Sequence, residues 1–185
     1  MIGSSHGSTR GCALLKQEAE SAEFSLLPGT HSNISVEAKN GRKTVQPDLI
    51  VKTKSVYCVV EAKGLRRSSF QHRQLAREFR LAHTAEDKIP QQTPLLLLVL
   101  TRPPLVLIQG KGRQSLETAI MAGLREEISP EEMSGWQEKI RETVTWITWS
   151  DIDRIVQRNF NAMNIADRSV QASIKRLVQS ISEFH

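Results

Sequence analysis

Three charged side chains lie in two segments that have the composition of β-strands. Asp48 stands near the start of the first segment, residues 46–52, and Glu61 and Lys63 end the second, residues 56–63. Successive side chains of a strand alternate between the two faces of a sheet, so Glu61 and Lys63 point to the same face. The short polar linker between the segments is typical of a hairpin loop, and a hairpin would allow Asp48 to approach that pair.

Two carboxylates and one ammonium group would then converge at the end of an otherwise apolar sheet. Burying such groups without partners is costly, because a charge in a medium of low polarity loses its hydration. A divalent cation held by oxygen ligands would offset that cost. The types and the spacing of these residues therefore indicate a metal site.

The motif that these residues form is similar to one in a known family. Pro47-Asp48, a hairpin, and then Glu61-Ala62-Lys63 on the next strand resembles the active-site signature of the PD-(D/E)XK, or restriction-endonuclease-like, nucleases. The order of the surrounding elements over about residues 14–108 is also similar: a helix, three strands, a helix and a strand. The specificity of so short a signature comes from its placement on consecutive strands.

The resemblance implies a hydrolytic mechanism. Asp48, Glu61 and the backbone carbonyl of Ala62 would bind Mg²⁺, for which Mn²⁺ could substitute. The ion would lower the pKa of a bound water and neutralise charge on the scissile phosphate. Lys63 would orient or deprotonate that water, or hold a phosphate oxygen. The implied function is hydrolysis of phosphodiester bonds in nucleic acid, with DNA expected rather than RNA.

Two further site residues follow from the resemblance. Many family members add a glutamate from the first helix, for which Glu18 is the preferred candidate, with Glu20 and Glu23 as alternatives. Some branches use a glutamine on the helix after the lysine, and Gln74 is the best match. A branch similar to lambda exonuclease would carry a tyrosine four residues after that glutamine, where this chain has Glu78. The sequence therefore does not indicate that branch.

Basic residues near the motif could contact a phosphate backbone, which positions nucleic acid without reading its sequence. The expected contacts are Lys52, Arg66, Arg67, Arg73 and Arg77. The chain has a formal net charge of +5 and a pI of about 9.5, which favours a polyanionic partner without identifying one. A solvated helix surface explains the arginines within residues 69–85 equally well.

The hydropathy pattern predicts a single α/β domain with a mixed central β-sheet flanked by helices, in the restriction-endonuclease-like order, and an α-rich C-terminal extension. Helices are expected over residues 11–24, 69–85, 114–128, 152–160 and 170–184. Strands are expected over residues 34–38, 46–52, 56–63, 94–100, 105–108 and 144–149, with a hairpin turn at Asn40-Gly41. The domain would consist of a flexible lead at residues 1–10, a nuclease-like core at 11–110 and a mainly helical part at 111–185.

The composition argues against a disulfide-rich, a zinc-binding, a membrane-spanning or a secreted protein. The two cysteines, Cys12 and Cys58, do not make a disulfide framework, and the spacing of Cys and His does not suggest a zinc site. The longest apolar run, residues 95–100, has the length of a strand, and residues 1–11 lack the apolar core of a signal peptide. These features favour a reducing, cytoplasmic setting without a membrane.

The leading hypothesis is a Mg²⁺-dependent deoxyribonuclease, with an endonuclease favoured over an exonuclease. Cleavage of both strands of a duplex by so small a chain favours a homodimer, and a subunit of a larger nucleic-acid-processing complex is the other assembly considered. Two alternatives stay open. One is a catalytically inactive nucleic-acid-binding or assembly module with the same fold, and the other is an unrelated α/β domain in which Asp48, Glu61 and Lys63 are structural.

Overall fold

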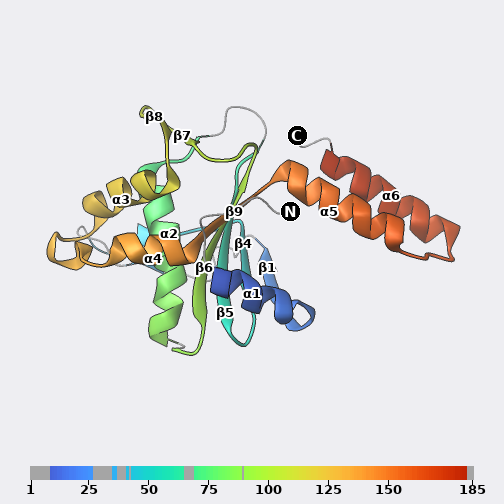
Figure 1. Ribbon diagram of the computed structural model, residues 1–185, viewed down its shortest axis with the longest axis horizontal. Helices are drawn as coiled ribbons and strands as arrows, with labels where there is room; N and C mark the ends of the chain where they lie inside the picture. The colour runs from blue at the N-terminus through green and yellow to red at the C-terminus, as the bar shows by residue number, and fades with distance from the viewer. Residues whose placement is uncertain are drawn as a thin grey trace.

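The computed structural model describes residues 9–26, 35–36, 41, 43–64, 69–88 and 90–182. These residues form an α/β structure in which a five-stranded sheet lies between helices on its two faces (Figure 1). The predicted class, a mixed central sheet flanked by helices, is confirmed.

The central sheet combines an antiparallel half with a parallel half. Its strands, in spatial order, are β1 (Glu23–Leu26), β4 (Leu49–Lys52), β5 (Val56–Ala62), β6 (Thr93–Leu100) and β9 (Val144–Thr148). β1, β4 and β5 pair antiparallel, whereas β5, β6 and β9 pair parallel. Helices cross between the parallel strands, and β5 and β6 are therefore apolar on both faces, as buried parallel strands are.

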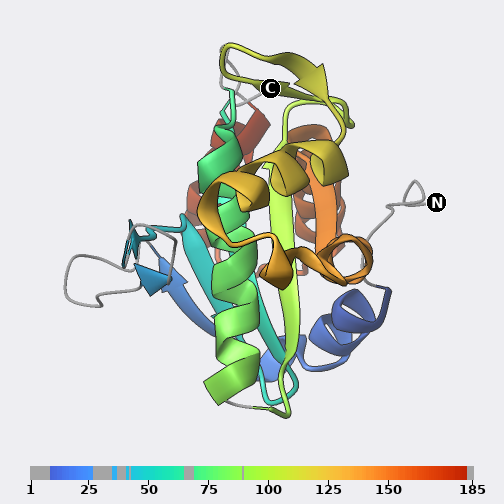
Figure 2. The same ribbon diagram turned by 90° about the vertical axis from the view of Figure 1, so that its left-hand side faces the viewer.

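One face of the sheet is covered by α2 (His72–Lys88), with α3 (Leu116–Glu127) and α4 (Trp136–Thr143) outside it (Figures 1 and 2). Leu75 and Phe79, one turn apart on α2, are fully buried against this face. Burial of each such side chain contributes about 1.5–3 kcal/mol. The apolar stripe of α2 thus fixes which side of the helix faces the strands.

The other face is covered by α1 (Thr9–Gln17) and by the start of α5 (Trp149–Ala162). Cys58 of β5 is fully buried in this second core, and burial raises the pKa of its thiol to about 12. Cys12 of α1 packs against the same core, and both cysteines are free thiols. Alternate residues of β5 therefore point to two different cores, which sets Glu61 on the α2 face.

The first part of the chain differs from the prediction. The helix expected over residues 11–24 ends at Gln17, a short 3-10 helix η1 (Ala19–Ser21) follows, and β1 forms the edge of the central sheet. Glu23 and Phe24, which were expected in the helix, form part of β1 because they pair with β4. This pairing depends on a segment distant in the sequence, so local composition does not reveal it.

Two small sheets lie outside the central one. The strand expected over residues 34–38 appears as β2 (Ser35–Val36), which pairs antiparallel with β3 (Lys43–Thr44) on the two sides of the predicted turn. It is separate from the central sheet, so the prediction that it opens the three-strand meander is wrong. The hairpin of β7 (Val106–Ile108) and β8 (Gly112–Gln114) is the second small sheet, and a short 3-10 helix η2 (Glu131–Met133) precedes α4.

Two C-terminal helices form a hairpin that projects from the body (Figure 1). α5 and α6 (Arg168–Ser182) are both amphipathic, but Val178 is the one residue of α6 that is fully buried. Val170 and Leu177 of α6 remain 45% and 67% exposed. The last helix therefore packs on α5 rather than on the sheet. None of the described helices is long and apolar enough to cross a lipid bilayer.

Gly123 of α3 allows a close contact with the amino end of α2. A Cβ atom at this position would lie 2.1 Å from the carbonyl oxygen of His72 and 2.8 Å from the Cβ of Ala76. No side chain fits there without moving the backbone of α2. Because Gly123 has no side chain, α3 can pack closely against the turn of α2 that carries Gln74.

Candidate active site at the end of the β4–β5 hairpin

Asp48 and Glu61 meet where the β4–β5 hairpin opens. Leu49 pairs with Val60, so one further step of this antiparallel register sets Asp48 opposite Glu61. Side chains of directly opposed residues lie on the same face, with Cβ atoms about 5 Å apart. The Oδ2 atom of Asp48 also accepts a hydrogen bond of 2.8 Å from the backbone N–H of Ala62. The two carboxylates therefore share one end and one face of the sheet.

Lys63 and Gln74 complete a cluster around the Glu61 carboxylate. The Lys63 Nζ atom lies 2.6 Å from Glu61 Oε1 and donates to Gln74 Oε1 at 3.3 Å. The Gln74 Nε2 atom donates to the same Glu61 oxygen at 2.5 Å. The structure thus brings together Asp48, Glu61, Lys63 and Gln74, all of which the sequence predicted as site residues.

Glu78 joins the cluster from the next turn of α2. Its Oε1 atom accepts a hydrogen bond of 2.9 Å from Gln74 Nε2. Glu61 and Glu78 are 3% and 1% exposed, so two buried acidic groups share one hydrogen-bonded cluster with one amine. Burial raises the pKa of Glu78 well above its ordinary value, and the negative charge of Glu61 raises it further. The cluster is consequently rich in acid.

Contacts from three other elements hold Lys63. Its backbone N–H donates to the carbonyl oxygen of Val99 on β6 at 2.9 Å, and its carbonyl oxygen accepts from the indole Nε1 of Trp149 at 2.8 Å. The Lys63 amine lies 5.1 Å from the centre of the Phe70 ring, within the range of a cation–π contact. These contacts fix both the backbone and the amine of Lys63.

The donor set at the open end of the hairpin suits a hard divalent cation. Asp48 Oδ1 takes part in none of the hydrogen bonds or ion pairs found among the described residues, and the Lys63 amine and the Gln74 amide both bind the same Glu61 oxygen, Oε1. The N–H and C=O of one strand residue point toward the same neighbouring strand, so the Ala62 carbonyl faces the side on which Asp48 lies. Three oxygen donors from two strands fit Mg²⁺, which retains several waters in protein sites.

The described residues contain no group of three or more His, Cys, Asp or Glu side chains arranged to hold a metal ion. Asp48 and Glu61 are two carboxylates, so a metal here would depend on the Ala62 carbonyl and on water for the rest of its coordination. A site of this kind excludes zinc of the structural type, which requires four protein ligands.

The prediction that Glu18 joins this site is wrong. Both of its carboxylate oxygens bind Ser55, one to the backbone N–H at 3.0 Å and the other to the hydroxyl at 2.7 Å. Ser55 precedes β5, so Glu18 lies at the opposite end of that strand, about 20 Å from Glu61 at 3.3 Å per residue. Hydrogen bonds from Thr53 and Ser55 lower the pKa of Glu18.

The alternatives from the same segment do not reach the site either. Glu20 is an exposed residue of η1, and Glu23 pairs with Lys52 at the same far end of the sheet. Lys52 itself lies 5.6 Å from the centre of the Tyr57 ring. It therefore lies at the end of β4 away from Glu61, and its contact with a phosphate backbone stays a prediction.

The predicted phosphate-binding arginines of α2 have partners within the protein. Arg77 binds Glu127 of α3 at 2.6 Å, and its side chain is 25% exposed. Arg73 binds Glu126 of α3 at 2.7 Å, and its side chain is 61% exposed. Both guanidinium groups tie α2 to α3, and a phosphate contact stays a prediction for the more exposed Arg73. Arg66 and Arg67 lie outside the described residues.

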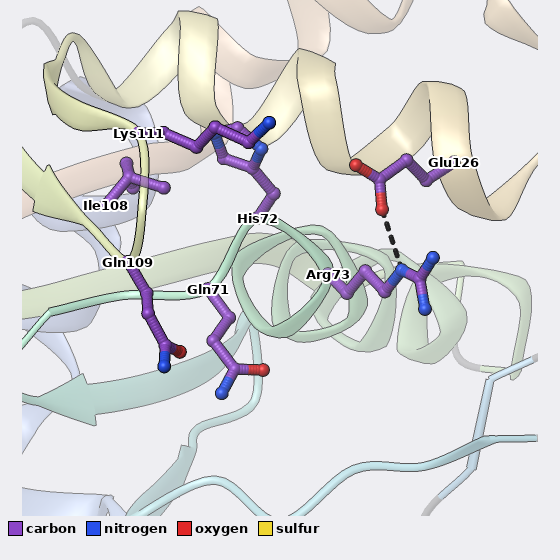
Figure 3. A pocket seen from close by; sticks show the side chains of 7 residues that line it. All are labelled: Gln71, His72, Arg73, Ile108, Gln109, Lys111 and Glu126. Atoms are coloured by element: carbon purple, nitrogen blue, oxygen red, sulfur yellow. Dashed lines mark hydrogen bonds and ion pairs between the residues drawn. The ribbon is translucent and has the colours of Figure 1, made fainter.

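A pocket of about 280 Å³ opens at the amino end of α2, one turn from Gln74 (Figure 3). Its walls come from α2, the β7–β8 hairpin and α3, through Gln71, His72, Arg73, Ile108, Gln109, Lys111 and Glu126. His72 Nε2 lies within hydrogen-bond distance of Gln114 Oε1, at 2.8 Å. Mostly polar side chains line the pocket, and none of Asp48, Glu61, Lys63 and Gln74 is among them.

Two members of the site were not foreseen from the sequence. Glu78 follows Gln74 by four residues, a spacing that sets both on one side of a helix and could have indicated it. Trp149 is separated from Lys63 by 86 residues, and no local pattern signals that contact.

Comparisons with known proteins found no match: no family model, no curated protein and no solved structure matches the chain. The function must therefore be inferred from the site itself.

Proposed function

We propose that this protein is a metal-dependent nuclease that hydrolyses phosphodiester bonds in nucleic acid, with DNA as the expected substrate. The observation that supports this most is the cross-strand register of Asp48 and Glu61, with the Lys63 amine 2.6 Å from Glu61. Like charges directly opposite each other destabilise a sheet. A pair of carboxylates in this position is favourable when a cation neutralises them.

Each residue would have a separate role. Asp48, Glu61 and the Ala62 carbonyl would hold Mg²⁺, which when bound supplies a water of lowered pKa and neutralises charge on the phosphate. Lys63 would orient the attacking water or bind a non-bridging phosphate oxygen as negative charge develops. Gln74 would keep the Lys63 amine and the Glu61 carboxylate in place through its two hydrogen bonds.

The topology supports the same proposal. An antiparallel hairpin that carries the acidic residues, followed by a helix and a parallel strand, resembles the core of the restriction-endonuclease-like fold. An endonuclease that acts as a homodimer on duplex DNA is the form we favour. Within the family, the expected products are a 5′-phosphate and a 3′-hydroxyl.

Burial distinguishes the enzyme from a binding module. A module that only contacts phosphate would gain nothing from Glu61 and Glu78, two acidic groups that are almost completely buried. A structural role is also a poor account, because a buried ion pair is often no more stable than apolar residues of similar volume. An acidic cluster beside one amine has a clear use in metal-assisted hydrolysis.

The test is cleavage of supercoiled plasmid, linear duplex, single-stranded DNA and RNA in Mg²⁺, in Mn²⁺ and in EDTA. Asp48→Ala and Lys63→Ala serve as site variants, and Glu18→Ala serves as a matched control at the other end of the hairpin. The proposal expects metal-dependent nicking by the wild type and the control, and much slower nicking by the site variants. Binding without cleavage would favour the inactive module, and neither binding nor cleavage would favour an unrelated domain.

A further inference from the structure

Glu78 is a buried carboxyl group for which the proposed hydrolysis has no direct use. It is 1% exposed, and it lies between Leu75 and Phe79, which are among the largest fully buried side chains. Its Oε2 atom is buried and accepts no hydrogen bond from a donor of the described residues, but the Glu61 carboxyl group lies close enough to share a hydrogen bond with the Glu78 carboxyl group. Burial of an unsatisfied polar atom destabilises a fold, so the presence of a glutamate here calls for an explanation.

The explanation lies in the side-chain amide of Gln74. An amide has one oxygen that accepts and one NH₂ group that donates two hydrogen bonds. In the structure the oxygen accepts from Lys63, and the NH₂ group donates to Glu61 and to Glu78. All the groups of this amide are therefore used, and Glu78 binds the N–H that Glu61 does not.

The orientation of that amide matters for the whole cluster. A 180° rotation would direct the NH₂ group at the Lys63 ammonium and the oxygen at the Glu61 carboxylate, which repels both neighbours. Loss of Glu78 would leave one N–H without an acceptor in a buried place, and the amide would then gain from turning toward any other acceptor. Lys63 and Glu61 thus favour the observed orientation, and Glu78 reinforces it from the helix side because it accepts the second N–H.

We propose that Glu78 is a positioning residue, which holds the Gln74 amide so that its oxygen faces Lys63 and one N–H faces Glu61. This inference rests on the proposed nuclease function for its effect on catalysis, but the positioning itself is a property of the folded protein. The residue acts through Gln74 and does not touch the substrate. Outer partners of this kind typically change activity or metal affinity about 10- to 100-fold when removed.

The test compares Glu78→Gln with Glu78→Leu in the full-length protein. Gln retains an acceptor for the Gln74 N–H in a side chain of the same shape, whereas Leu removes it. We expect Glu78→Leu to lower kcat about 10- to 100-fold with little change in KM, and Glu78→Gln to recover most of that loss. Gln92→Leu is the matched control, because Gln92 is a buried amide at the other end of the hairpin. Its Nε2 atom donates to the carbonyl oxygen of Thr53, and its side-chain oxygen has no partner among the described residues.

A structural role would give a different pattern. It predicts that the loss of activity follows the loss of stability in every variant, including Gln92→Leu. The positioning role predicts that Gln92→Leu lowers the melting temperature and keeps kcat, whereas Glu78→Leu keeps or raises the melting temperature and loses kcat. Equal kcat in Glu78→Leu and wild type, or equal loss in Glu78→Leu and Glu78→Gln, would overturn the proposal.

A second measurement does not depend on catalysis. The side-chain amide protons of Gln74 give a pair of ¹H–¹⁵N signals that can be assigned by their absence in Gln74→Ala. We expect both protons to exchange slowly in the wild type and in Glu78→Gln, and at least one to exchange rapidly in Glu78→Leu. Unchanged exchange in Glu78→Leu would refute the positioning role even if the protein proves to have no nuclease activity, so the two proposals can fail separately.

Discussion

The two ends of the β4–β5 hairpin both hold a carboxylate that accepts a hydrogen bond from the backbone, but they differ in what surrounds it. At the turn, Glu18 accepts from the backbone N–H and from the hydroxyl of Ser55, so both of its oxygens have a donor. At the open end, Asp48 accepts from the backbone of β5, and Glu61 and Glu78 add two buried carboxyl groups behind it.

The pKa directions record the same difference. Hydrogen bonds from Thr53 and Ser55 lower the pKa of Glu18, whereas burial and the charge of Glu61 raise the pKa of Glu78. Donors satisfy the acid at the turn, while acceptors exceed donors at the open end. The comparison teaches that a surplus of acceptors, rather than the presence of acid, separates a candidate site from a structural contact.

Removing one carboxylate from each end is the strongest test of this distinction. Asp48→Ala is expected to lower the rate of plasmid cleavage on the order of 10²–10³-fold, because it removes a group that would stabilise charge in the transition state. Glu18→Ala is expected to cleave at the wild-type rate at a temperature where it remains folded. Initial rates in Mg²⁺, beside circular dichroism of each variant, provide the measurement. Similar losses in both variants would contradict the distinction.

The next test disturbs the open end from a distance. Gly123→Ala adds a Cβ atom that would lie 2.1 Å from the His72 carbonyl oxygen, so the amino end of α2 must move. We expect a loss of about 1–3 kcal/mol in the free energy of unfolding, together with reduced cleavage, since Gln74 moves with α2. Gly64→Ala, whose Cβ would meet nothing within 4 Å, is the control for stability in denaturant unfolding. Equal stability of the two variants would show that α3 does not clamp α2.

Much of the open end could be predicted from the sequence because its geometry is local. Asp48, Glu61 and Lys63 lie on adjacent strands, where alternation and a short loop fix the register. Gln74 follows on the next helix, whose apolar stripe sets the direction of its side chain. Glu18 could not be predicted, because the first helix ends one residue before it and η1 redirects the chain toward the turn.

The pH dependence of stability should have opposite signs at the two ends. The pKa of Glu18 is lowered on folding, so its contribution is present above the ordinary value of 4.5 and is lost as the pH falls through the lowered pKa. The pKa of Glu78, which faces Glu61, Gln74 and Lys63, is raised, so its contribution is present below 4.5 and is lost as the pH rises.

Glutamine variants provide the measurement for both signs. The melting temperature of the wild type should exceed that of Glu18→Gln at pH 7 and approach it below pH 4.5. The melting temperature of the wild type should fall relative to that of Glu78→Gln as the pH rises above 4.5, measured in EDTA to exclude bound metal. If the difference in melting temperature between wild type and variant changed with pH in the same direction for Glu18→Gln and for Glu78→Gln, the balance of donors and acceptors would not distinguish the two ends of the hairpin.

The smallest expected effect concerns how far the open end extends toward the substrate. Arg73 is exposed and binds Glu126, and an exposed ion pair stabilises a fold little, so Arg73→Ala should melt close to the wild type. If Arg73 leaves Glu126 to contact a phosphate, the variant should bind duplex DNA more weakly, and the slope of log affinity against log salt should fall by about one. Glu126→Gln is the matched control, since it removes the shorter of the two ion pairs of Arg73 and should retain the slope. An unchanged slope in Arg73→Ala would show that Arg73 only holds α2 against α3 and does not contact a phosphate. The substrate-binding end of the hairpin would then consist of the carboxylates, Lys63 and Gln74.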